Sequence, residues 1–149
     1  MGRMNLGRIV VGGLIAGFAY NVVNWIGHGL ILEAVSTDTM AEPHIAPPSI
    51  GQRVQLWSIW MLYGVMVAWL YAAMRPRFGE GFRTAAFAAT TVWIVGIVVP
   101  ALPNWVLGFF SLGTILADLL VGIVGLLIGA VLAGLIYQEP VLSEGTAPK

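Results

Sequence analysis

The chain has 149 residues, of which 58% are hydrophobic and only 9% are charged. A soluble domain carries roughly a quarter charged residues because its surface faces water, so this composition excludes an ordinary soluble protein. The formal net charge of zero argues against a nucleic-acid partner. The chain has no cysteine, which excludes disulfides, thiolate metal sites and thiol redox chemistry. We therefore expect the lipid bilayer to be the main surrounding of this protein.

Four apolar stretches are long enough to cross a hydrocarbon core of roughly 30 Å as helices. They predict spans at about 9–32, 54–74, 84–102 and 114–137. The first stretch is too long for the hydrophobic region of a signal peptide, so we expect it to be retained. Ser111 and Gly113 divide the last stretch, which predicts an interfacial segment at about 103–113 before the fourth span. The expected fold is an all-α, antiparallel bundle of four transmembrane helices.

The basic residues indicate how this bundle is oriented. With the N-terminus inside, one basic residue, Arg53, lies outside, and the other six lie in the cytoplasm: Arg3, Arg8, Arg75, Arg77, Arg83 and Lys149. This asymmetry follows the positive-inside rule and predicts that both termini are cytoplasmic. The predicted connections are an outer loop at 33–51, an inner loop at 75–83 and an inner tail at 138–149.

The outer loop ends in a helix-start signal. Ser49-Ile50-Gly51-Gln52 has the pattern of a capping box directly before the second span. The loop also carries charged or ionisable residues that could hold a cation, although solvated loop charges are the simpler interpretation. They are Glu33, Asp38, Glu42 and His44.

Small and polar residues follow one face of the first span. Gly13, Gly17, Asn21, Asn24 and His28 are spaced by three or four residues, which places them on one side of a helix. The glycine pair lets a neighbouring backbone approach closely. Asn21 lies near the predicted midplane, where an unpaired amide costs several kcal/mol. We therefore expect this face to point into protein or into a wet cavity.

The fourth span carries a similar stripe. Asp118 is followed at helical spacing by Gly122, Gly125 and Gly129, three further candidates for close helix packing. Asp118 is the one acidic residue within any apolar stretch. Under the predicted orientation it lies at the same depth as His28, near the outer ends of their spans.

These residues predict an outward-facing polar pocket made of Asn21, Asn24, His28, Gln55 and Asp118. An ionisable residue within a membrane suggests a functional site, so the pocket could bind a small ligand, relay a proton or hold a metal or pigment through the imidazole. The alternative is a structural clamp between the first and fourth spans. Interhelical hydrogen bonds of this kind stabilise by about 0.6–2 kcal/mol each, and at this depth the clamp is the favoured interpretation.

Signatures of a specific chemistry are missing from the sequence. No Ser-His-Asp order, phosphate loop or catalytic carboxylate pair is visible, so no catalytic residue is predicted. A single intramembrane histidine without a partner is a poor metal site, and no metal is expected. Trp25, Trp57, Trp60 and Trp105 lie near the predicted outer interface and are typical of an aromatic belt. Asn-Trp occurs at both 24–25 and 104–105, which chance explains better than duplication.

The stretch from Trp69 to Ala85, WLYAAMRPRFGEGFRTA, resembles the central loop of a group of small, uncharacterised bacterial four-span membrane proteins. Members of this group also carry an Asn and a His-Gly pair near the end of the first span, as Asn24 and His28-Gly29 do here. The Trp that usually follows the first span in this group is absent. The resemblance implies a multi-pass protein of the bacterial inner membrane and implies no activity.

Three functions remain open on this basis. The leading expectation is a non-enzymatic accessory subunit that binds other membrane proteins or itself, because little of the chain lies outside the membrane and glycine stripes suit close packing. The second is a small carrier or an ion- or proton-conducting oligomer that uses the His28 and Asp118 pocket. The third is a subunit that binds a pigment or haem, with His28 as axial ligand.

Overall fold

The computed structural model describes residues 4–32 and 48–137. The regular elements in these residues are all helical, which confirms the expected all-α class. In chain order they are α1 (Leu6–Gly27), the π-helical turn η1 (His28–Leu32), α3 (Ile50–Phe78), α4 (Phe82–Trp93), the π-helical turn η2 (Ile94–Val98), α5 (Val99–Val106) and α6 (Leu112–Ile136). The charged residues of the predicted outer loop and the whole predicted tail lie outside the described residues.

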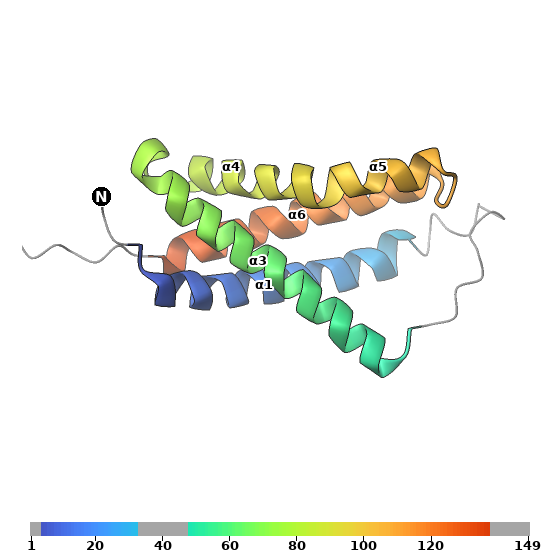
Figure 1. The fold of residues 1–149 in the computed structure, drawn as a ribbon, viewed down its shortest axis with the longest axis horizontal. Coiled ribbons are helices and arrows are strands. Elements are labelled where there is room, and N and C mark those ends of the chain that lie inside the picture. Colours follow the sequence, from blue (N-terminus) through green and yellow to red (C-terminus); the bar gives the residue numbers. More distant parts are fainter. Residues whose placement is uncertain (1–3, 33–47, 138–149) are drawn as a thin grey trace, which may run out of the picture.

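The helices form four rods, because η1 continues α1, and η2 joins α4 to α5 without a break. Each rod is long and apolar enough to cross a membrane. Successive rods run in opposite directions (Figure 1). At one end of the bundle, α1 and α5 finish while α3 and α6 begin; we call this the His28 end. The α3–α4 turn lies at the other end.

Side-chain caps define where two of the rods begin. Ser49 accepts a hydrogen bond from the backbone N–H of Gln52, and Gln52 accepts one from that of Ser49, so the predicted capping box is confirmed. Ser111 caps α6 by accepting from the N–H of Thr114. The last apolar stretch is therefore divided at Ser111, whereas Gly113 lies inside α6.

The third rod extends to Val106, so the predicted segment 103–113 begins inside α5 and ends inside α6. Pro100 lies inside this rod. Proline lacks an N–H and crowds the carbonyl four residues earlier, here that of Gly96. The helix widens to the π-helical turn η2 at this point. The Tyr63 hydroxyl of α3 donates to the Gly96 carbonyl at 2.9 Å, and the rod continues.

The first rod packs between α3 and α6, and glycines make both contacts close. A β-carbon at Gly13 would lie 2.6 Å from Cα of Val65 in α3, and one at Gly17 would lie 2.8 Å from Cα of Met61. Gly64 of α3 faces Gly13 and Gly17 in return. The two helices therefore cross backbone to backbone, as small residues allow within membranes.

The three predicted packing glycines of α6 also contact other helices of this chain. β-Carbons at Gly125 and Gly129 would each lie 2.9 Å from atoms of α1, namely Cδ2 of Tyr20 and the carbonyl oxygen of Ala16. A β-carbon at Gly122 would lie 2.9 Å from Cδ1 of Ile97 in η2. The glycines of both stripes thus pack against helices of the same chain.

The turn between α3 and α4 contains the residues that carry the family resemblance. Gly79 and Gly81 have φ of 80° and 114°, a left-handed conformation that favours glycine. The Thr84 hydroxyl donates to the Gly79 carbonyl at 2.7 Å, and Arg75 forms an ion pair with Glu80. The motif therefore builds a tight helical hairpin.

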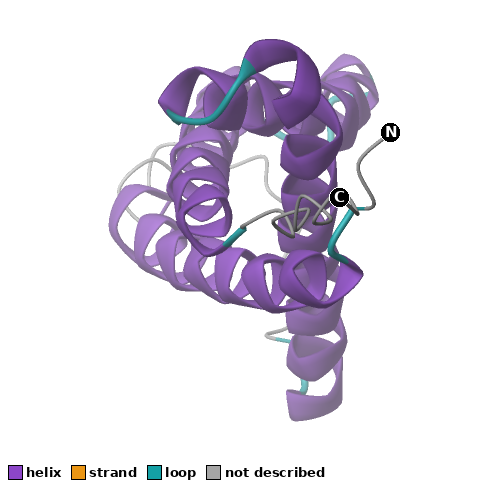
Figure 2. Ribbon diagram, turned by 90° about the vertical axis from the view of Figure 1, so that its left-hand side faces the viewer, coloured by secondary structure: helices purple, strands orange, loops and turns teal. Residues whose placement is uncertain are grey.

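The rods lie close together over much of their length and separate toward the His28 end. Eight alanines belong to the buried core: Ala16, Ala68, Ala72, Ala85, Ala88, Ala89, Ala130 and Ala133. In contrast, residues 50–59 of α3 are all exposed, and this part of α3 projects away from the other helices (Figures 1 and 2). The bundle is consequently open where α3 departs.

Candidate functional site

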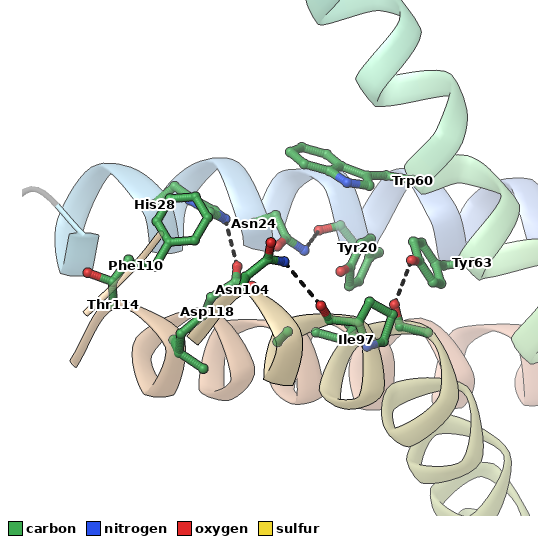
Figure 3. A pocket seen from close by; sticks show the side chains of 14 residues that line it. Tyr20, Asn24, His28, Trp60, Tyr63, Ile97, Asn104, Phe110, Thr114 and Asp118 are labelled. Atoms are coloured by element: carbon green, nitrogen blue, oxygen red, sulfur yellow. Dashed lines mark hydrogen bonds and ion pairs between the residues drawn. The ribbon is translucent and has the colours of Figure 1, made fainter. Parts of the chain in front are cut away.

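A cavity of about 700 Å³ lies at the His28 end, and all four rods contribute to its wall. The first part of α3 projects away from the other helices at this end (Figure 1). Figure 3 shows the wall residues from close by. They are Tyr20, Asn24, His28, Trp60, Tyr63, Gly96, Ile97, Pro100, Ala101, Asn104, Phe110, Thr114, Ile115 and Asp118.

His28 and Asp118 form an ion-pair contact in this wall. Nε2 of His28, at the start of η1, lies 3.3 Å from Oδ1 of Asp118, which is near the beginning of α6 (Figure 3). The side chains are 39% and 41% exposed, respectively, so a molecule in the cavity can reach both. The imidazole also stacks on the indole of Trp60, with ring centroids 6.4 Å apart and planes inclined by 17°.

Two asparagines contribute oxygen atoms to the same wall. The Nδ2 group of Asn24 donates to the carbonyl of Tyr20 at 2.9 Å, and that of Asn104 donates to the carbonyl of Pro100 at 3.1 Å. Because a carbonyl only accepts, these bonds determine which end of each amide is nitrogen. Each side-chain oxygen is therefore left as a hydrogen-bond acceptor.

The predicted pocket residues divide into two groups. Asn24, His28 and Asp118 line the cavity, whereas Asn21 and Gln55 do not. Asn21 is fully buried below it, donating from Nδ2 to the carbonyl of Gly17 at 2.9 Å and to that of Trp57 at 3.4 Å. Gln55 is exposed on the projecting part of α3, because the helix leaves the bundle before this residue.

Several aromatic wall residues were not predicted as site residues. Trp60, interpreted above as part of an aromatic belt, stacks on His28. Tyr20 and Tyr63 lie with their rings 5.7 Å apart. The sequence does contain two signals that would have pointed here. Pro100 cannot donate to the carbonyl of Gly96, which therefore needs another donor. Asn104-Trp105 repeats the Asn-Trp pair of residues 24–25.

A search for related proteins leaves the site to be interpreted from its own chemistry. No family model, no curated protein sequence and no solved structure matches the chain. The fold defines the class, a bundle of four helices each able to cross a membrane. Within 4–32 and 48–137, no third His, Asp or Glu joins His28 and Asp118 in a group that could hold a metal ion.

Proposed function

We propose that this protein binds a small molecule in the cavity at the His28 end, in the manner of a small membrane carrier, and that the Asp118 carboxylate contacts the ligand. One observation carries the proposal: the contacting side chains of His28 and Asp118 line a cavity of about 700 Å³ to which all four rods contribute. Ligand sites are typically cavities of about 300–1,000 Å³ with an apolar, aromatic wall and a few placed polar groups.

The two other functions receive less support. The glycine stripes suggested an accessory subunit, but these glycines contact helices of the same chain and so are not available to a partner. A haem or pigment would be held by an imidazole nitrogen, and Nε2 of His28 lies against the Asp118 carboxylate. Axial ligation through Nε2 would require the pair to separate.

Filling the cavity should remove the ligand. Ala101 lies in the wall and is 8% exposed, so Ala101→Trp is expected to occupy the space, with Ala101→Leu having a smaller effect. Ala73→Trp is the matched control, because Ala73 is exposed on α3. Native mass spectrometry of protein extracted gently from its own membranes should show a small molecule bound to the wild type and to Ala73→Trp, and at least tenfold less bound to Ala101→Trp.

Circular dichroism should first establish that Ala101→Trp and Ala101→Leu remain folded. A wild type without a bound small molecule, or equal occupancy in both tryptophan variants, would contradict the proposal. Lipids held on the lateral surface would produce the second of these results.

We further propose that the protein lies in the bacterial inner membrane with both termini in the cytoplasm, so that the cavity opens outward. The support is the distribution of arginines among the described residues. Four lie at the end of the bundle opposite His28: Arg8, Arg75, Arg77 and Arg83. One, Arg53, lies at the His28 end. Positive residues are retained on the cytoplasmic side of short loops.

Cysteine labelling tests this orientation, and the cysteine-free wild type gives no background. Phe82 at the start of α4 and Phe109 in the turn before α6 are 66% and 53% exposed. Phe109→Cys should react with a membrane-impermeant maleimide in intact cells, whereas Phe82→Cys should react only after the membrane is permeabilised. Reaction of both from the same side would exclude the proposed arrangement.

A further inference from the structure

We infer that the ligand of this cavity is a lipophilic organic cation, and this inference rests on the proposed function. Among the described wall residues, Asp118 supplies the one carboxylate, and none is Lys or Arg. Arg53, which lies at this end, donates instead to the carbonyl of Pro48 at 3.0 Å. The Asp118 carboxylate is therefore the negative group that the described wall offers to a ligand.

The uncharged polar groups add to this negative character. Since Asn24 and Asn104 donate from their nitrogens to backbone carbonyls, each adds the oxygen end of its dipole to the wall. The Tyr63 hydroxyl donates its hydrogen bond to the Gly96 carbonyl, so its oxygen is left as an acceptor. An anion would be repelled by the carboxylate and by these oxygens, whereas a cation would be attracted by both.

The aromatic side chains suit the same kind of ligand. Tyr20, Trp60, Tyr63 and Phe110 line one cavity, and aromatic ring faces attract cations, more strongly when water is excluded. The rings also provide apolar area for a lipophilic body. In the absence of ligand, the His28 imidazole contacts the Asp118 carboxylate. A bound cation would take the place of the imidazole at this carboxylate.

Three probes of similar shape and different charge test the inference: tetraphenylphosphonium, triphenylphosphine oxide and tetraphenylborate. Isothermal titration of the full chain in detergent should show saturable binding of the cation at least tenfold tighter than that of either other probe. Asp118→Asn should weaken cation binding at least tenfold. His28→Gln should retain or improve it, because that variant keeps the carboxylate and removes its competitor. Unchanged melting temperatures would show that both variants remain folded.

Binding of the neutral or anionic probe as tightly as the cation, insensitive to Asp118→Asn, would overturn the inference while leaving a ligand cavity in place. An equal loss in His28→Gln and Asp118→Asn would also overturn it, because the pair and not the carboxylate would then be the anchor. Absence of binding by all three probes would overturn it as well. The small-molecule function itself is judged separately, by the occupancy of Ala101→Trp.

Discussion

Gly64→Ala is expected to destabilise the bundle by about 1–3 kcal/mol or more, the range seen when atoms are forced into a filled core. A β-carbon at this position would collide with the backbone of α1, at Gly17 N and Cα and at the Gly13 carbonyl oxygen. Backbone cannot turn aside as a flexible side chain can. Relief therefore requires α1 and α3 to separate, and Gly64→Val should have a larger effect.

Gly51→Ala is the control for this experiment, since it makes the same change on the same helix. A β-carbon at Gly51 meets nothing within 4 Å, so alanine there should stabilise by up to about 1 kcal/mol through its helix propensity. Thermal unfolding in detergent, followed by circular dichroism, should thus shift in opposite directions for the two variants. Shifts of the same sign and size would show that α1 and α3 do not cross at Gly64.

Asn21→Asp is expected to cost about 3–5 kcal/mol, as a buried charge without a partner does. Asn21 is fully buried, and its Nδ2 group donates to the carbonyls of Gly17 and Trp57. Its Oδ1 atom has no hydrogen-bond partner within the described part of the chain. The surroundings thus offer acceptors and no donor, so a carboxylate there would face two carbonyl oxygens with nothing to neutralise it.

Asn5→Asp provides the matched control on the same helix. Asn5 caps α1 by accepting from the N–H of Arg8 at 3.2 Å, and aspartate caps helices about as well as asparagine. The yield of folded protein and its melting temperature in detergent should fall sharply for Asn21→Asp and hardly change for Asn5→Asp. Similar melting temperatures for the two variants would show that Asn21 is not enclosed between α1 and α3.

The candidate site shows how far sequence reasoning reaches. The spacing of residues gives depth along a helix, and from depth alone His28 and Asp118 were predicted to lie at one level; their side chains are 3.3 Å apart. The spacing of residues does not show which side chains of a neighbouring helix face the same cavity. Gln55 was predicted to join them and is exposed, whereas Trp60, five residues further along α3, lies in the wall.

The difference between Gln55 and Trp60 arises from where α3 leaves the bundle. α3 crosses α1 where Gly64 lies against Gly13 and Gly17. The part of α3 that precedes this crossing projects from the bundle. No periodicity within α3 contains this information, because it depends on how two distant segments approach each other.

The sequence by itself determined the number of apolar rods, the all-helical class, the start of α3 at its serine cap, and the glycines able to pack closely. These properties follow from composition, helical spacing and hydrogen bonds between residues near in sequence. The tertiary structure alone decided that a cavity exists, that Tyr20, Trp60, Tyr63 and Asn104 line it, and that the third rod continues past Pro100. The physical reason is that helix tilt, and the donation from Tyr63 to the Gly96 carbonyl, are settled only when separate helices pack together.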